Sequence, residues 1–362
     1  MTEALLNREL EKSRNDIESF FEDFFRSQAP GLAAVNSWGA DFIKRIRPFA
    51  TGGKMIRGCL VRLALDGYGA VPGRGIGPRA ARRDAVKAGA ALELFHSAFL
   101  IHDDIMDDDP FRRGKPSLHV QYAAMAGRKG HPDAAGFGRA AALCAGDVLI
   151  FLGLEILASL ESPAPVKTRI LGLFGRELAA VGPAQVQDVY SGKVSRASSR
   201  EEIFRLYTYK TARYTYFLPL AAGALLAGAG PAALRDLERI GVDLGLVFQV
   251  KDDELGQFGD PAATGKPVGS DIGEGKKTLY YLYLCQALGP KAAALYGKKR
   301  PTAREIHRLN SLIRRLGIPE TIEQDLGRIA GRCAQRIRRA SLPAGFKDAL
   351  KALLETSLKR TF

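Results

Sequence analysis

Helical spacing of apolar residues runs through most of this chain and constrains its fold more than any other feature. Apolar residues recur at intervals of three and four over 84–109 and again over 233–260, which is the period of an α-helix. No segment alternates apolar and polar residues over a length typical of a strand. Stretches rich in Gly and Pro, such as 127–138 and 259–277, separate the helical runs. The pattern predicts an all-α fold, a bundle of about a dozen helices around buried central ones, in a single domain over residues 1–362.

The bulk composition excludes a membrane-spanning or disulfide-rich protein. Apolar residues make up 46% of the chain and charged residues 25%, an ordinary globular mixture. The 4 cysteines lie far apart with no CxxC pair, which favours a reducing compartment. The longest apolar run, 217–230, is too short and too rich in Gly and Ala to cross a bilayer. We therefore expect a cytoplasmic protein with no transmembrane segment.

The net charge of +14 raises the question of a polyanionic partner. The main basic clusters, 297–317 and 331–341, look helical and carry no interleaved aromatic residues for base stacking. They are typical of solvated helix faces, so we expect no nucleic-acid partner. A small substrate with several negative charges would account for a local share of the excess.

The first long helical run ends in an acidic cluster, "FLIHDDIMDDDPFRRG" (99–114). Asp103 and Asp107 are one turn apart and share a helix face, and His96 lies two turns before Asp103 on nearly the same line. Crowded carboxylates attract a hard cation, and Mg2+ typically links one or two carboxylates to a substrate phosphate. The alternative is a solvated acidic helix end.

A second acidic pair, Asp252 and Asp253, ends the apolar run of 233–260, with Gln249 one turn earlier and Asp260 just beyond. Two such helix ends indicate a facing pair that could hold a diphosphate through divalent ions.

Fixed cations accompany both acidic clusters. They are Lys54 and Arg57 behind a Gly-Gly turn, Arg112 and Arg113, Lys210 beside Thr211, Lys266, and Lys276. Each alone is weak evidence, since a loop lysine is usually solvated. Together they suit two diphosphate ligands, one held through Mg2+ and one held directly by Arg and Lys.

In this order the motifs "GGKMIRG", "HDDIMDDDPFRRG", "YKTA", "FQVKDD", "GKPVGSD" and "GKKT" resemble those of the trans-isoprenyl diphosphate synthases, the polyprenyl synthetase family. The resemblance covers roughly residues 45–350. It implies the isoprenoid synthase fold, a bundle of long antiparallel helices around a central cavity, and a homodimer.

The resemblance also implies an activity and a role for each site residue. The activity is a (2E)-prenyl diphosphate synthase: isopentenyl diphosphate attacks the cation left when an allylic diphosphate ionises, and diphosphate is released. Two or three Mg2+ ions would be bound by Asp103, Asp107, Asp252 and Asp253. Isopentenyl diphosphate would be held by Lys54, Arg57, His96 and Arg113. The allylic diphosphate would contact Arg112, Lys210, Gln249, Lys266 and Lys276. The groups nearest the reaction would be Lys210, Thr211 and Gln249.

Departures from the family pattern lie in two motifs. Gly256 stands where the second aspartate motif normally has its third Asp, which removes one ligand and costs a helix about 1 kcal/mol relative to Ala. Met55 and Gly58 depart from the usual residues of the Gly-Gly motif, whereas Lys54 and Arg57 remain. We expect activity with one metal site altered.

Product length is expected to depend on Phe99 and Ala98, because in this family bulky side chains just before the first motif shorten the product. Phe99 lies one turn, about 6 Å, before Asp103. The large Phe99 beside the small Ala98 predicts partial blocking of the tunnel that holds the growing prenyl chain. We therefore expect geranylgeranyl diphosphate as the main product, with farnesyl diphosphate as the second choice. The alternative is that Phe99 only packs the core.

Two other functions stay open. A class I terpene cyclase would use one metal-held diphosphate, which the Gly-Gly motif and the Arg112–Arg113 pair disfavour. A catalytically degenerate regulatory subunit of a prenyl synthase is favoured only by Gly256.

Overall fold

The computed structural model describes residues 1–69, 77–194, 198–259, 272–273, 275–289, 292 and 301–359. The contacts divide the chain into two compact units, which are described separately. The first comprises Met1–Leu173, Pro219–Leu234 and Leu342–Ala349; the second comprises Phe174–Leu218, Arg235–Ser341 and Leu350–Phe362. The single-domain organisation stays a prediction.

Helices build the first unit. They are α1 (Glu3–Val35), α2 (Ser37–Thr51), α3 (Ile56–Tyr68), α4 (Pro78–Met106), α5 (Leu118–Arg128) and α6 (Ala134–Ala158), with parts of α7 (Ala164–Ala179), α10 (Leu218–Leu226) and α17 (Ala344–Leu358). Between α4 and α5 lies a hairpin of β1 (Phe111–Arg112) and β2 (Lys115–Pro116). The all-α prediction is confirmed, and this two-residue pairing is its one departure among the described residues.

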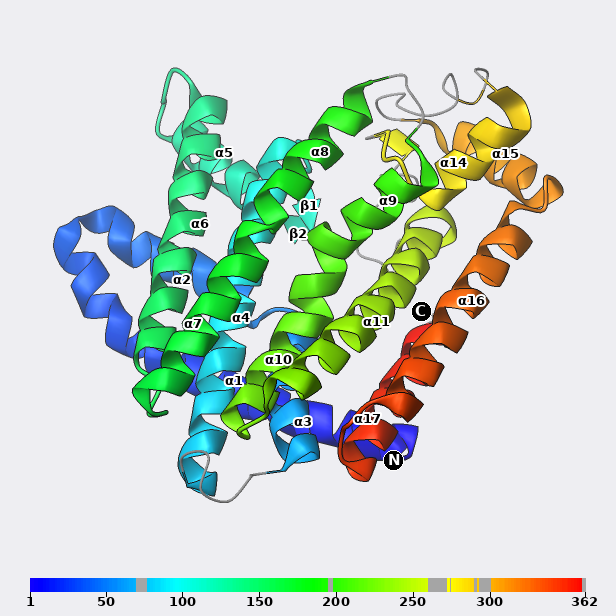
Figure 1. Cartoon of the computed structure of the whole chain (residues 1–362). Coiled ribbons are helices and arrows are strands. Elements are labelled where there is room, and N and C mark those ends of the chain that lie inside the picture. Colours follow the sequence, from blue (N-terminus) through cyan, green and yellow to red (C-terminus); the bar gives the residue numbers. More distant parts are fainter. Residues whose placement is uncertain are drawn as a thin grey trace. The chain divides into compact units, whose positions relative to one another are not determined.

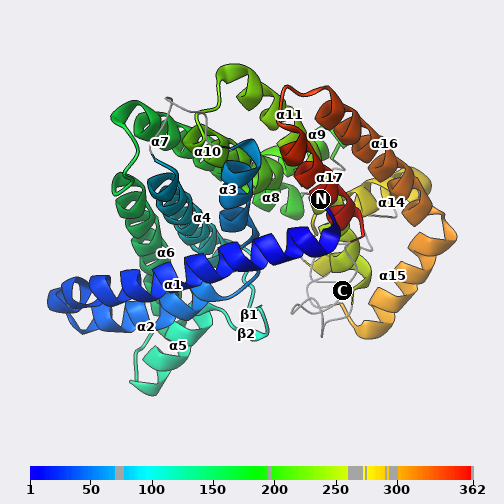
Figure 2. The ribbon, with the colours of Figure 1, turned by 90° about the horizontal axis from the view of Figure 1, so that it is seen from below.

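Helix α4 is the central element of the first unit. Pro78 stands at its first turn, where a missing N–H costs nothing, and its apolar positions are buried almost along its whole length. It packs against α3 and α6, and Figures 1 and 2 show α4 and α6 side by side. Contact with α6 is close because Gly153 faces Phe95: a Cβ there would come within 3.0 Å of the Phe95 ring.

Helix α6 also has the length and composition of a membrane span, as no other helix of the described residues does. Only 44% of the most apolar 18-residue stretch of α6 is buried. Core helices of soluble proteins pass the same test, so this is weak evidence for a membrane span.

The hairpin after α4 was not expected because its loop is Arg113-Gly114 rather than a typical Asn-Gly pair. Arg112 pairs with Lys115, and both loop residues have positive φ, 53° for Arg113 and 72° for Gly114. That is the two-residue type I′ geometry, which suits strand twist. The turn reverses the chain directly after the acidic end of α4.

The second unit is also helical in its described residues. It contains the end of α7, α8 (Val181–Lys193), α9 (Arg200–Tyr207), η1 (Thr208–Phe217), most of α11 (Pro231–Phe258), α14 (Leu279–Leu288), α15 (Ala303–Arg315), α16 (Ile318–Arg339) and the end of α17. Figure 2 shows α15 and α16 following one another, and the chain turns between them at Gly317, whose φ is 68°.

A π-helical segment, η1, carries the "YKTA" motif. Widened turns of this kind are rare and often occur at functional sites. Two glycines of α11 allow η1 to approach: a Cβ at Gly245 would lie 2.3 Å from Ala212 Cα, and one at Gly241 would lie 2.7 Å from Phe217 Cα. The close backbone contact fixes the position of η1 against α11.

Candidate active site

The acidic end of α4 is neutralised in part by an arginine of the following hairpin. Arg112 Nε donates to Asp104 Oδ1 at 2.7 Å, and its Nη2 reaches Asp109 at 3.4 Å and Asp103 at 3.8 Å. Asp104 is almost fully buried, with 1% of its side chain exposed. A buried carboxylate needs such a partner. Arg112 therefore supplies part of the positive charge that this aspartate cluster requires.

Asp103 and Asp107 stand at this end of α4 on one face. The backbone N–H of Asp107 still donates to the Asp103 carbonyl at 2.9 Å, so the helical one-turn spacing holds through the motif. Within the part of the chain that the structure describes, no three His, Cys, Asp or Glu side chains gather closely enough to hold a metal by themselves. A pair of carboxylates fits Mg2+, which completes its shell with water and substrate phosphate.

The Gly-Gly turn before α3 is held by a carboxylate of α4. Met55, at the N-cap of α3, has a φ of 44° and makes no capping hydrogen bond with its side chain. Glu93 of α4 instead accepts the Gly58 N–H at 2.8 Å. Gly58 and Gly89 let the two helices touch, because a Cβ at Gly89 would lie 2.8 Å from the Gly58 carbonyl oxygen. This contact positions the first turn of α3, which carries Arg57.

Glu93 is only 4% exposed. Burial raises the pKa of Glu93 above its ordinary value, although the charge of Arg57 and the Gly58 N–H oppose that rise. The protonation of the Glu93 carboxyl group therefore depends on the basic motif around it, and the position of that motif depends on its hydrogen bond to Glu93.

Arg113 extends over the same turn. Its Nη1 donates to the Phe49 carbonyl oxygen at 3.1 Å, and a Cβ at Gly53 would come within 2.8 Å of its Nη2. A side chain at position 53 would displace this guanidinium, and the φ of 123° at Gly53 also favours glycine. The structure thus brings Arg113 to the turn that carries Lys54, and the binding of isopentenyl diphosphate there stays a prediction.

His96 lies on α4, in the field of these cations. Burial and then the charges of Arg57, Arg113 and Arg112 hold the pKa of His96 well below its ordinary value. The imidazole is therefore neutral near pH 7, and it can hydrogen-bond a phosphate without adding charge.

At the end of α11 the two aspartates of the second motif have different surroundings. Asp252 is exposed, whereas Asp253 is buried. Asp253 accepts a hydrogen bond from Gln249 Nε2 at 2.8 Å and another from the Tyr207 hydroxyl. Tyr207 in turn accepts the Leu279 N–H at 3.3 Å. Asp252 is therefore the accessible carboxylate, and Asp253 fixes the helix end.

Lys210 of η1 forms an ion pair with Asp188 of α8. Only 10% of the Asp188 side chain is exposed, so the pair is well shielded and fixes the ammonium in one place. Gln185 lies one turn earlier on α8 and is buried, and Thr211 follows Lys210 on η1 with a half-buried side chain.

Lys276 is half-buried and lies just before α14. Leu279, three residues on, donates its N–H to the Tyr207 hydroxyl of α9. The neighbouring Lys277 lies over the Tyr281 ring at 4.1 Å, and burial lowers the pKa of its ammonium.

The remaining predicted residues have plainer surroundings. Ala98 is fully buried in α4, and Phe99 is half-buried. Lys266 and Asp260 lie outside the described residues.

Three groups in these sites had no predicted role or only a general one. Glu93 had none, although a charged residue on the apolar face of 84–109 was a visible signal. Tyr207 precedes the "YKTA" motif with no signal of its own. The pairing of Asp188 with Lys210 depends on how η1 lies against α8.

Comparison with known proteins decides the family. The family model described as polyprenyl synthetase matches residues 44–313. This chain belongs to the polyprenyl synthetase family. A geranylgeranyl diphosphate synthase of Mycobacterium tuberculosis is 30% identical over 349 residues, covering 95% of this chain and 89% of the relative.

Other comparisons agree over different shares of the chain. A geranylgeranyl diphosphate synthase of Sulfolobus acidocaldarius is 33% identical over 68% of this chain and 71% of its own. A short chain isoprenyl diphosphate synthase of Methanothermobacter thermautotrophicus is 36% identical over 63% of this chain and 62% of its own. Among solved structures, geranylgeranyl pyrophosphate synthase from Corynebacterium glutamicum, complexed with isoprenyl diphosphate and magnesium, has a TM-score of 0.89 and 29% identity, covering 97% of this chain and 99% of that one.

Family membership confirms the predicted resemblance, the isoprenoid synthase fold and the enzyme class. This polyprenyl synthetase is a trans-prenyl diphosphate synthase, and it catalyses prenyl chain elongation.

Proposed function

We propose that the enzyme condenses isopentenyl diphosphate head-to-tail with an allylic diphosphate, depends on two or three Mg2+ ions, and makes geranylgeranyl diphosphate as its main product and farnesyl diphosphate as its second. The observation that carries this proposal is the basic turn before α3. Glu93 holds that turn, and Arg113 reaches it from the hairpin. It provides a diphosphate site built from Arg and Lys, separate from the carboxylates that suit a metal.

The basic turn would bind isopentenyl diphosphate directly. Arg57 and Arg113 offer forked donors suited to phosphate oxygens, and Lys54 adds a point charge. Neutral His96 would donate one further hydrogen bond without increasing repulsion among the cations. A cyclase, with one diphosphate to bind, has no use for this second site.

The allylic diphosphate would be held by the aspartate helix ends and by fixed lysines. Asp103, Asp107 and the exposed Asp252 would hold the ions. Asp253 remains a proposed ligand, although its oxygens already accept two hydrogen bonds. When bound, Mg2+ stabilises the negative charge that develops on the leaving diphosphate.

The chain's own cations assist the same ionisation. Lys210, oriented by Asp188, would stabilise charge on the leaving oxygens, with Arg112, Lys266 and Lys276 as further contacts. Gln249 and Thr211 would lie near the allylic cation. The released diphosphate would take the proton lost in the final step, since no side chain stands out as a general base.

A turnover assay tests the proposal. Labelled isopentenyl diphosphate is incubated with each allylic primer, with Mg2+ or with EDTA. We expect primer-dependent elongation that EDTA abolishes, with twenty-carbon product as the main peak in chromatography. Hydrocarbon release would instead indicate a cyclase, and no turnover with any primer would indicate a regulatory subunit.

We also propose a homodimer in a cytoplasmic setting. Leu143, Phe151 and Leu154 of α6 are exposed at 43%, 68% and 45%, and large apolar side chains gathered on one helix favour a partner surface. The exposed free thiol of Cys144 suits a reducing compartment. Phe151→Glu is expected to convert the dimer to a monomer, as measured by light scattering. The control Glu22→Gln, at an exposed position on α1, is expected to keep the molar mass of the dimer. A wild-type protein that is monomeric at micromolar concentration would refute the dimer.

A further inference from the structure

A pocket of about 430 Å³ opens between α11 and α16, and none of its lining residues belongs to the motifs of the candidate active site. Its lining is dominated by guanidinium groups and consists of Asp236, Arg239, Arg332, Gln335, Arg336, Arg339 and Ala340. The residues of α16 recur at helical spacing, so they share one face of that helix. All of the lining lies within the second unit.

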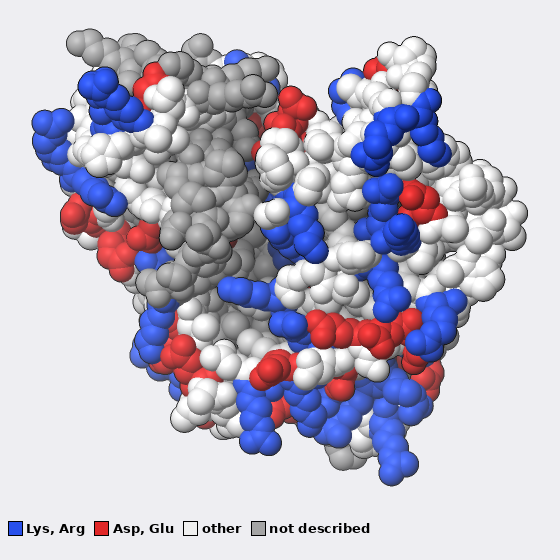
Figure 3. Space-filling view, turned by 180° about the vertical axis from the view of Figure 1, so that it is seen from behind, with Lys and Arg blue, Asp and Glu red and all other residues white. Residues whose placement is uncertain are grey.

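High net charge alone does not mark a binding site on this protein. On the face shown in Figure 3, basic side chains are interspersed with acidic ones. The pocket differs because it gathers four arginines around one concave space, where Asp236 is the only acidic residue of the lining.

A buried aspartate orients two of the four arginines. Asp243 of α11 is 0% exposed. Arg332 donates to its Oδ1 through Nε at 3.0 Å and through Nη2 at 2.7 Å, and Arg336 Nη1 donates to its Oδ2 at 2.8 Å. Each guanidinium has five N–H donors, so both keep donors for a ligand while their position is fixed. Preorganised donors of this kind lower the entropic cost of binding.

The other two arginines are held less tightly. Within the described residues, the guanidinium groups of Arg239 and Arg339 form no ion pair. Asp236 accepts the Ser341 N–H at 2.9 Å, so one of its oxygens is engaged in the turn after α16. Two acidic groups, Asp236 and Asp243, therefore face four cations, and the pocket keeps an excess of positive charge.

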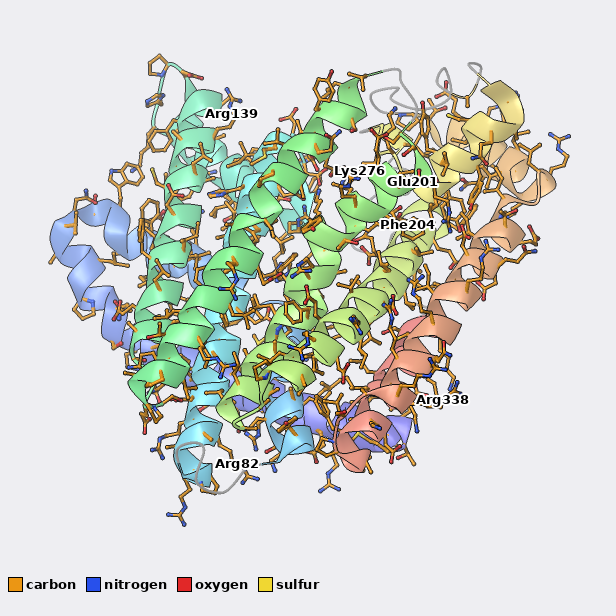
Figure 4. All side chains as sticks on the ribbon, in the orientation of Figure 1. Arg82, Arg139, Glu201, Phe204, Lys276 and Arg338 are labelled. Carbon is orange, nitrogen blue, oxygen red and sulfur yellow. The ribbon has the colours of Figure 1, made fainter. Side chains whose placement is uncertain are left out.

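The helix dipole accounts for only part of this arrangement. Cations in the last turn of a helix are stabilised by its partial negative charge, which explains Arg336, Arg339 and their neighbour Arg338, labelled in Figure 4. It does not explain Arg239, which comes from α11, or the hollow that all four arginines line.

We propose that this pocket binds a phosphate-bearing anion. The forked geometry of Arg matches phosphate oxygens. The chemistry is shared by two sources, a free diphosphate and the headgroup of an anionic phospholipid. The site is separate from the catalytic motifs and does not require that they turn over.

The test removes the two arginines that do not support Asp243. Arg239→Gln with Arg339→Gln takes away two charges and leaves the buried aspartate paired, so the fold is expected to survive; changing Arg332 or Arg336 would strand a buried charge. The matched control is Arg304→Gln with Arg308→Gln, which removes the same charge from exposed positions on α15. Circular dichroism and turnover are expected to match wild type for both.

Two binding arms distinguish the sources. Inorganic diphosphate is titrated calorimetrically in EDTA, and the proteins are sedimented with phosphatidylglycerol or phosphatidylcholine vesicles. If the ligand is a free anion, the pocket variant should lose one diphosphate-binding site per chain or bind diphosphate there about tenfold more weakly. The control variant should keep this site unchanged. A headgroup site predicts the same loss only with phosphatidylglycerol vesicles. Identical behaviour of wild type and pocket variant in both arms, or equal loss in the control variant, overturns the proposal.

Discussion

Glu93 offers the sharpest test of how this site is built, because one buried carboxylate supports the whole basic turn. It lies in α4, is 4% exposed, and accepts the Gly58 N–H at 2.8 Å where α3 has no side-chain cap of its own. Hydrogen bonds to a charged group contribute about 1.5–3 kcal/mol. Glu93→Ala removes that bond and leaves a cavity, so we expect a loss of about 2–4 kcal/mol in the free energy of unfolding.

Glu93→Gln separates the charge from the hydrogen bond. The amide oxygen can still accept the Gly58 N–H, but the negative charge beside Arg57 is gone. We expect a smaller loss, about 1–2 kcal/mol. Because the turn orients Lys54 and Arg57, the KM for isopentenyl diphosphate is expected to rise about tenfold in Glu93→Ala, with a smaller change in the KM for the allylic primer.

The assays are urea unfolding and steady-state kinetics with each substrate varied in turn. The exposed Glu22→Gln on α1 is the control and should change neither. Unchanged stability in Glu93→Ala would refute the capping role. Lost stability with both KM values unchanged would refute the positioning role and leave Glu93 as part of the core only.

Three further predictions follow from other residues. Phe99→Ala is expected to lengthen the main product by one or more isoprene units in chromatography, since it opens the space before Asp103; an unchanged product would assign Phe99 to core packing. His96 has a lowered pKa when folded, so below about pH 6.5 the unfolded chain binds a proton that the folded chain does not. Stability should therefore fall with decreasing pH by up to about 1.4 kcal/mol per unit, and His96→Gln should show a shallower decline in unfolding experiments from pH 7 to pH 5; equal slopes would contradict the assignment. Asp188→Asn should lower kcat more than it raises the KM for isopentenyl diphosphate, because it releases Lys210 from its fixed position, and the reverse pattern would count against a role for Lys210 at the leaving group.

Local spacing made the aspartate motifs predictable. Asp103 and Asp107 share a face because a helix repeats every 3.6 residues, and that repeat could be read directly from 84–109. The basic turn was also visible, since two glycines before a Lys and an Arg indicate close backbone approach. What could not be read was the partner of each charge. Arg112 was expected at a substrate phosphate, and in the structure its guanidinium donates to Asp104.

The amino-acid sequence by itself determined the helices, their apolar faces and the order of the charged motifs, because these depend on neighbours within a few residues. Only the tertiary structure decided which charges are joined. Glu93 meets Gly58 because α3 and α4 touch at glycines, and Lys210 meets Asp188 because η1 packs beside α8. Such pairings arise from contacts between segments distant along the chain, where burial makes an unpaired charge costly and so selects one partner.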